Sequence, residues 1–198
     1  MPVAKEYPLL ALSLDPANLG TGTWQPVSLG GGITTHHVTG LTMFQDLILI
    51  AHYLDEASWI TALDFNTLEF KWRQCLWKTR DAHSIAIHHG VLLVASTGTE
   101  QILAYRIKND QLCEPYVYWQ GEESGKDIKH LNSVFSANGK ALVSSFGPKR
   151  SDLWSSSARN GYLYCIEDQE MIKDNLDHPH TVYWRNGQIY YCESMRGT

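Results

Sequence analysis

Histidine is the residue type whose spacing in this sequence most clearly suggests chemistry. The chain of 198 residues contains nine histidines. Seven of them fall at or beside equivalent positions of a repeated segment: His36, His37, His52, His83, His130, His178 and His180. Imidazole takes up and releases protons near neutral pH and is a common metal ligand. A fold that gathers these side chains would therefore contain a histidine-rich pocket.

Three positions are the best candidates for binding a metal: His83, Asn132 and His180. Imidazole nitrogens suit zinc, iron, copper and nickel, and amide or carboxylate oxygens extend the range to manganese and calcium. The pattern is compatible with one divalent metal ion as cofactor, held by His83, His180 and His37, with Asn132 or Glu193 completing its coordination. The alternative is a structural role, because histidines at a polar axis also hydrogen-bond one another, backbone carbonyls and buried water.

Seven further positions are expected to contact a bound ligand: His37, His52, Ser96, His130, Ser145, His178 and Glu193. Their side chains offer hydrogen-bond donors and acceptors and one carboxylate. Neither serine stands in the strand-turn-helix context of a nucleophile elbow. The sequence therefore assigns no catalytic residue and leaves open whether the protein is an enzyme.

A repeated segment would position these side chains. Fourteen-residue segments that start at His83, Asn132 and His180 share a polar first residue, an apolar alternating stretch, a glycine at the eighth position and a second β-rich stretch. A fourth copy starts at Thr39 and has Asp46 in place of the glycine. The copies begin between 44 and 49 residues apart, which is the length of a four-stranded propeller blade.

The repeat predicts an all-β chain of β-propeller blades, each with four antiparallel strands. Glycine, Asn-Gly or Asp at the eighth position tolerates the positive φ of a tight hairpin turn, so each copy supplies two paired strands. Further stretches are rich in β-branched and aromatic residues and predict outer strands: 58–65, 69–76, 101–107, 116–120 and 161–166. The innermost strand of a blade lines the central channel, so the first residue of each copy is expected to face one shared axis.

The repeat divides the chain into N-terminal strands over residues 1–35, blades over 36–80, 81–127 and 128–176, and a partial blade over 177–198. About four blades are present. In one interpretation the N-terminal strands supply the missing outer strands and close a four-bladed ring, which avoids an open edge. We favour the other interpretation, in which the chain is part of a larger, six-bladed propeller, because its last residues look like the middle of a blade.

Composition narrows the classes of partner. A net charge of −5 and a pI near 6 give no basic surface of the kind that binds nucleic acid or anionic membranes. The first sixteen residues have neither the layout of a signal peptide nor the length of a membrane span, so we expect a cytoplasmic protein. Four scattered cysteines form no C-x-x-C pair and are expected to be buried free thiols.

Two local features have more than one interpretation. His88 and His89 stand beside the turn glycine Gly90, and we expect both to be exposed to solvent. Residues 151–160 are longer than a blade hairpin needs, so they form either a plain exposed insertion or a loop over an opening of the channel.

Two segments carry a resemblance to known families. Residues 130–145 resemble the blade signature of the gluconolactonase- and regucalcin-like six-bladed propellers, which implies that Asn132 contributes to an axial divalent-metal site. His180 departs from that pattern, since the family has an acidic ligand there. Residues 178–194 more closely resemble a group of uncharacterised bacterial β-propeller-like proteins, a domain of unknown function. That resemblance covers residues 36–198 and implies the fold without an established activity.

The sequence favours a propeller whose axial pocket binds a small molecule. The reaction would be metal-assisted hydrolysis, lactone opening or oxidation, and no residue favours one of them. The alternative is a non-catalytic scaffold that binds another protein, as the same fold serves both purposes. A broad exposed patch of four tryptophans would indicate the scaffold: Trp59, Trp72, Trp77 and Trp119.

Overall fold

The computed structural model describes residues 10–15, 18–30, 37–121 and 125–195. Strands dominate this part of the chain, and the helical elements within it are two short 3₁₀ turns, η1 (Thr97–Thr99) and η2 (Trp154–Ser157). Neither turn is long or apolar enough to cross a membrane. The prediction of an all-β chain is confirmed.

Three sheets have the size of a complete blade. The first has the order β3 (His37–Phe44), β4 (Leu47–Leu54), β5 (Ala57–Asp64) and β6 (Phe70–Cys75). The second has β7 (Ala82–His88), β8 (Val91–Ser96) and β9 (Gln101–Lys108), with β10 (Gln111–Leu112) and β11 (Tyr116–Gln120) both paired to β9. The third has β12 (Leu131–Ala137), β13 (Lys140–Ser145), β14 (Gly161–Cys165) and β15 (Glu170–Leu176). All pairings are antiparallel.

Two further sheets contain two strands each. β16 (Pro179–Arg185) pairs with β17 (Gln188–Glu193), and β1 (Leu10–Asp15) pairs with β2 (Asn18–Pro26). In the described part of the chain these two hairpins belong to separate sheets, so β1 and β2 do not complete the β16–β17 sheet. Within the described part of the chain, the N-terminal strands therefore do not close a four-bladed ring.

Turn chemistry sets the hairpin register as the repeat predicts. Asn138 and Gly139 both have positive φ, as do Asn186 and Gly187. The flanking residues of the first of these turns, Ala137 and Lys140, are paired directly, so the loop has two residues. Two consecutive positive φ values are what such a hairpin turn requires, because its twist then matches that of the strands.

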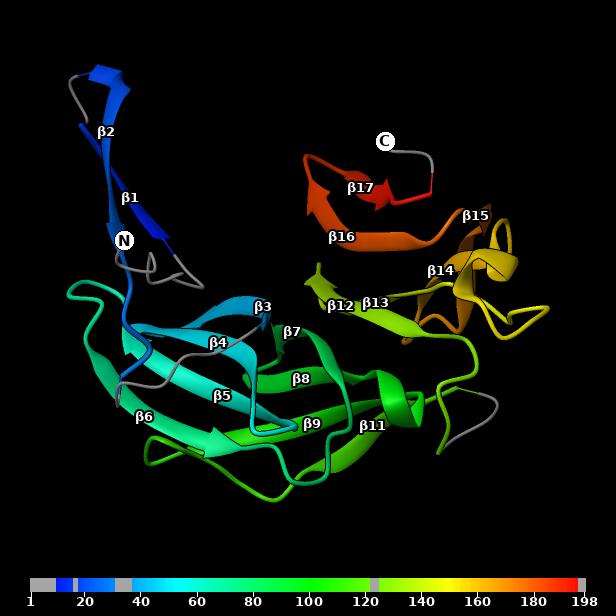
Figure 1. Cartoon of the computed structure of the whole chain (residues 1–198), viewed down its shortest axis with the longest axis horizontal. Coiled ribbons are helices and arrows are strands. Elements are labelled where there is room, and N and C mark those ends of the chain that lie inside the picture. The colour runs from blue at the N-terminus through cyan, green and yellow to red at the C-terminus, as the bar shows by residue number, and fades with distance from the viewer. Residues whose placement is uncertain (1–9, 16–17, 31–36, 122–124, 196–198) are drawn as a thin grey trace, which may run out of the picture.

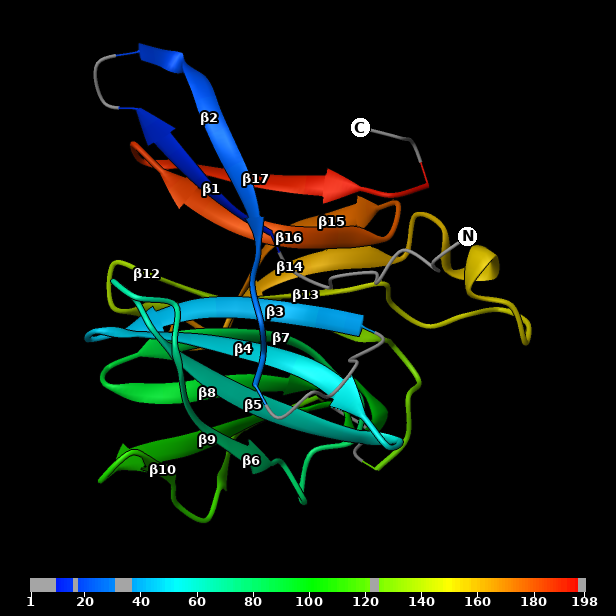
Figure 2. The ribbon, with the colours of Figure 1, turned by 60° about the vertical axis from the view of Figure 1, so that its left-hand side comes forward.

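The sheets follow one another in an arc in which the innermost strands β3, β7, β12 and β16 are successive neighbours (Figures 1 and 2). Each neighbouring pair of sheets shares a buried apolar layer. Leu49 and Ile60 of the first sheet pack in one cluster with Leu92 of the second, and Leu93 packs with Val143 of the third. The blades are therefore held to one another face to face, and the inner edges of the strands surround a common space.

His88 corrects one prediction. Its side chain is 1% exposed, and its Nδ1 lies 2.8 Å from the Ser136 hydroxyl of the neighbouring sheet. The prediction of an exposed His88 is wrong because the last residue of β7 points toward β12. His89, one position later in the turn, is exposed as expected.

Candidate functional site

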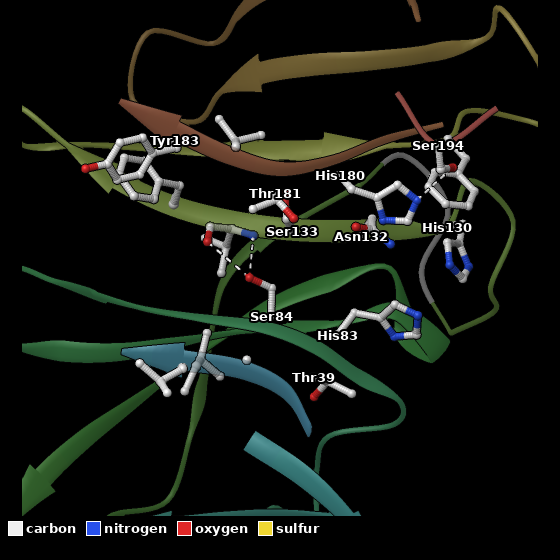
Figure 3. A pocket seen from close by; sticks show the side chains of 17 residues that line it. Thr39, His83, Ser84, His130, Asn132, Ser133, His180, Thr181, Tyr183 and Ser194 are labelled. Carbon is white, nitrogen blue, oxygen red and sulfur yellow. Dashed lines mark hydrogen bonds between the residues drawn. The ribbon is translucent and has the colours of Figure 1, made fainter. Parts of the chain in front are cut away.

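A cavity of about 930 Å³ lies among the innermost strands. The first residues of all four repeat copies line it, each from a different blade: Thr39, His83, Asn132 and His180 (Figure 3). These residues lie on β3, β7, β12 and β16. The periodic placement in the sequence thus becomes a spatial cluster, because each copy enters its blade in the same way.

The cavity has a polar end and an apolar end. Figure 3 shows His83, Asn132 and His180 gathered at one end, and Tyr183 at the other. Aliphatic and aromatic side chains complete the lining: Leu41, Ile85, Val134, Phe135, Phe146 and Val182. Among the described lining residues there is no Asp, Glu, Lys or Arg.

His83 is backed by a carboxylate. Its Nδ1 lies 3.1 Å from Asp81 Oδ1, and the Tyr53 hydroxyl donates a hydrogen bond to the same oxygen. The Nδ1 contact is short but poorly aligned for a hydrogen bond, so it is best described as an ion pair. Burial lowers the pKa of His83, but the contact with Asp81 and its charge outweigh burial and raise the pKa above its ordinary value. His83 therefore stays protonated to higher pH than a free histidine.

The pKa of His180 is shifted in the opposite direction. Burial lowers the pKa of His180, and the neighbouring histidines His130, His178 and His83 lower it further when they carry charge. Its Nε2 lies 3.1 Å from the Ser194 hydroxyl. His180 is therefore neutral near pH 7, within one cavity with a histidine that more readily holds its proton.

His130 closes the polar end together with aromatic rings. Its Nδ1 lies 3.2 Å from Asp127 Oδ2, and its ring meets the edge of His83 with 4.9 Å between centroids. The rings of Phe146 and Trp154 lie 4.4 and 4.6 Å from it. These contacts fix the imidazole in one orientation.

His178 lies behind the cavity and not in its lining. Its ring stacks on Phe146 at 4.3 Å, and it is 4% exposed. Ser157 donates to the Trp154 carbonyl at 2.8 Å, so its oxygen accepts from His178 Nε2, also at 2.8 Å. The segment 151–160 thus supports the aromatic residues beside the cavity, and burial lowers the pKa of His178.

Three of the predicted ligand-binding residues close loops instead of lining the cavity. Each contacts the backbone sixteen residues earlier: Ser96 donates to the Arg80 carbonyl at 3.2 Å, Ser145 donates to the Lys129 carbonyl at 2.5 Å, and Glu193 Oε1 accepts from the Asp177 N–H at 2.7 Å. In each blade the contact joins the end of the second strand to the segment that leads into the first. These residues therefore hold the loops that present the lining side chains.

The remaining predicted residues lie elsewhere. His37 is exposed at the start of β3 and does not line the cavity, and His36 lies outside the described residues. His52 is buried between β4 and β5, where its Nε2 lies 2.8 Å from the Thr61 hydroxyl. Burial, followed by the charge of Arg73, lowers the pKa of His52 to about 4.

The described residues do not present an assembled metal centre. Within the described ranges, no group of three or more His, Cys, Asp and Glu side chains is arranged to hold one. His83 Nδ1 and His180 Nε2 are both occupied by protein partners, Asp81 and Ser194. The metal role of His83, Asn132 and His180 stays a prediction.

Sequence reasoning missed Asp81 and Asp127, which orient the imidazoles, and Ser194, which contacts one of them. A signal for the acids was present, because Asp81 precedes His83 by two residues and Asp127 precedes His130 by three. Ser194 carries no comparable signal. Its position over His180 follows from the β16–β17 register, which pairs His180 with Cys192.

Comparisons with known proteins concern the fold. No protein-family model matches the sequence, and no curated protein is significantly similar to it. A chain of the nidogen–laminin complex is similar in structure, with a TM-score of 0.52 and 10% identity over 92% of this chain and 80% of that chain. Glutaminyl cyclase from Myxococcus xanthus gives a TM-score of 0.49 and 12% identity over 78% of this chain.

The chain spans 60% of the length of that glutaminyl cyclase. Identities of 10 and 12% carry no information on activity. The described sheets and the similarity to the nidogen–laminin chain agree on the architecture: the chain has an all-β, propeller-type fold.

Proposed function

We propose that the axial cavity binds a small, uncharged organic molecule through a polar group at the histidine end and an apolar part at the other end. The observation that carries this proposal is the convergence of the first residues of four repeat copies on one cavity. Thr39 and Asn132 add a hydroxyl and an amide to this lining. Thr39 Oγ1 is buried without a hydrogen-bond partner among the described residues, and the Asn132 amide likewise has none there.

An uncharged ligand fits the balance of charge. The described lining residues include no permanently charged side chain. The charge of a protonated His83 is offset by Asp81, whose Oδ1 lies 3.1 Å from His83 Nδ1. Likewise, Asp127 Oδ2 lies 3.2 Å from His130 Nδ1. A ligand with net charge would lose hydration without finding an opposite charge that is free to pair with it.

A pocket is favoured over a protein-interaction scaffold by the placement of the tryptophans. Of the four that would form an outer patch, Trp77 is exposed, at 63%, while Trp59, Trp72 and Trp119 are half-buried. The Lys78 ammonium lies 4.7 Å from the Trp77 ring centroid, so even this side chain is partly covered. The four tryptophans therefore do not form the broad exposed patch that would indicate the scaffold.

The test uses three neutral aromatic probes, benzamide, benzyl alcohol and acetophenone, because each joins a ring to one polar group. Saturation-transfer NMR detects binding, and isothermal titration gives the Kd. We expect at least one probe to bind, and we expect His83→Ala and Asn132→Ala to weaken it at least about five-fold through the loss of one hydrogen bond. The matched control is His89→Ala, which removes an exposed histidine at a hairpin tip.

Two outcomes would overturn the proposal. In one, no probe binds. In the other, a probe binds equally well to wild type, His83→Ala and Asn132→Ala, which would place it outside the cavity. Repeating the titration after treatment with EDTA, and again with added Zn²⁺, Mn²⁺ or Ca²⁺, tests the metal prediction separately. Binding that requires one of these ions and is lost in His180→Ala would support the metal role.

A further inference from the structure

The Ser194 hydroxyl and the His180 imidazole form a pair at the edge of the cavity. Ser194 Oγ lies 3.1 Å from His180 Nε2, and both residues line the cavity (Figure 3). The pair is set by the hairpin itself, because His180 is opposite Cys192 in the β16–β17 ladder and Ser194 follows two residues later. A serine oxygen becomes a nucleophile when an adjacent neutral imidazole can accept its proton.

His180 is suited to accept that proton. Burial and the neighbouring histidines lower its pKa, so the free base predominates near pH 7. The Ser194 hydroxyl has one competing acceptor, the His178 carbonyl, at 3.5 Å. That distance is at the limit of a hydrogen bond, so the shorter contact with His180 is the stronger of the two.

His83 provides the complementary group. Its Nδ1 faces Asp81, which leaves Nε2 for the cavity that His83 lines. The Asp81 contact raises the pKa of His83 even though burial lowers it. Two titratable groups whose pKa values are moved in opposite directions within one site can serve as base and acid at the same pH.

We propose that Ser194, His180 and His83 are the catalytic residues of an acyl transfer that hydrolyses neutral carboxylic esters in the axial cavity. This inference rests on the proposed function, because it uses the same cavity and the same kind of ligand. The ester carbonyl would occupy the polar end, and the hydrocarbon part would lie against Val134, Phe135 and Tyr183.

The reaction has two steps, acylation of Ser194 and hydrolysis of the acyl-serine. In the first, Ser194 Oγ bonds to the carbonyl carbon and its proton goes to His180. The bond from that carbon to the alcohol oxygen breaks, and His83 Nε2 gives its proton to the departing alkoxide. After both histidines have exchanged protons with solvent, a water molecule attacks the acyl-serine. His180 takes a proton from this water, the bond from the acyl carbon to Ser194 Oγ breaks, and His180 gives the proton to Ser194 Oγ. The net change is ester and water to carboxylic acid and alcohol.

Asn132 has a supporting part in both steps. Its amide has no protein partner among the described residues and lies at the lining of the cavity. Figure 3 shows it between His180 and His83. An amide N–H directed at the carbonyl oxygen would stabilise the negative charge that develops there. Asp81 and Tyr53 do not touch the ester and act as positioning residues for His83.

Covalent labelling tests the nucleophile directly. An alkyl fluorophosphonate reacts with activated serines, and mass spectrometry of the digested protein locates the label. We expect one label per chain, on Ser194, and we expect Ser194→Ala and His180→Ala to lose it. Ser155→Ala is the matched control, since it removes an exposed serine of the loop 151–160, and it should be labelled like wild type.

Kinetics with 4-methylumbelliferyl butyrate test the acid and base. We expect kcat/KM to fall roughly 100-fold in Ser194→Ala and His180→Ala, the size of effect that a general base contributes. The pH profile should rise as His180 loses its proton and fall at higher pH as His83 loses its own. Asp81→Asn should move the falling limb to lower pH, which a purely structural role of Asp81 would not do.

The outcomes separate this inference from the proposed function. Binding of a neutral aromatic probe together with no label on Ser194 would overturn the catalytic assignment and leave the binding function standing. Equal hydrolysis by wild type and Ser194→Ala would also overturn it, because surface imidazoles alone would then explain the rate. Absence of both binding and labelling would overturn the two proposals together.

Discussion

At the scale of single residues, His52 shows most clearly how burial sets protonation. It is 1% exposed, and its Nδ1 has no hydrogen-bond partner among the described residues. The Arg73 guanidinium donates to the same Thr61 oxygen that contacts His52 Nε2, at 2.9 Å. The charged guanidinium and the imidazole therefore share one hydroxyl oxygen, which disfavours a second positive charge on the His52 ring.

We predict that His52 makes the protein less stable as the pH falls. Its pKa is lowered to about 4 in the folded state, whereas the unfolded chain binds the proton near pH 6.5. The stability that the neutral ring contributes is complete above pH 6.5 and is lost as the pH falls toward 4, a change of about 3 kcal/mol. Urea unfolding at pH 7.0 and pH 4.5 measures it.

His52→Asn is the comparison that isolates this effect. His88, His178 and His180 also have lowered pKa values and contribute with the same sign, so wild type and variant should both lose stability in acid. We expect the loss to be smaller in the variant, because it lacks one of the titrating groups. Equal losses would show that His52 is not protonated on unfolding.

At the scale of elements, the contacts that span sixteen residues determine how each blade begins. Ser145 is fully buried, donates to the Lys129 carbonyl at 2.5 Å and also accepts from the Gly147 N–H at 3.3 Å. Lys129 is next to His130, so this one hydroxyl sets the entry into β12. Ser96 does the same for β7 through the Arg80 carbonyl.

We predict that Ser145→Ala destabilises the protein by about 0.5–1.5 kcal/mol, since it removes one of the two hydrogen bonds to the Lys129 carbonyl and leaves the one from the Gly147 N–H at 2.9 Å. Ser155→Ala, at an exposed position, should change the free energy of unfolding by no more than about 0.5 kcal/mol. Chemical denaturation of the two variants beside wild type makes the comparison. A Ser145→Ala variant as stable as the control would mean that water replaces the hydroxyl and that the contact does not hold the loop.

At the scale of the whole molecule, the shared apolar layers predict a gradient of stability along the chain. β4, β5, β8 and β9 contribute fully buried side chains to the layer between the first two sheets. From β16 and β17, Val182 is the one buried member of the apolar cluster shared with the third sheet, and much of the surface of both strands is exposed. Segments with few buried apolar contacts open more easily.

Hydrogen exchange followed by mass spectrometry measures this gradient. We expect amides of β4, β5, β8 and β9 to exchange slowest and those of β16 and β17 to exchange at least about ten-fold faster, which corresponds to about 1.4 kcal/mol in opening free energy. A uniform rate across all sheets would show instead that the described strands open as one unit.

Much of this architecture could be predicted because the repeat is local and periodic. Turn chemistry at Gly139 and Gly187 fixes the hairpins, and the spacing from His83 to Gly90 places His83 near the start of β7. His88 could not be placed in the same way, because its burial depends on the packing of β7 against β12. Ser194 likewise could not be identified from the sequence. It contacts His180 only because β16 pairs with β17, and the spacing of the serines along the chain does not show this pairing.

The four leading positions have one more consequence. The scaffold repeats, yet the residues it presents are Thr39, His83, Asn132 and His180, so a nearly symmetric frame encloses an asymmetric set of functional groups. Each of the four positions belongs to a different strand pair, and a substitution at one of them leaves the hairpins that carry the others intact. For the proposed small-molecule ligand, preference can change through one of these four positions at a time, by single codon changes, without rebuilding the frame.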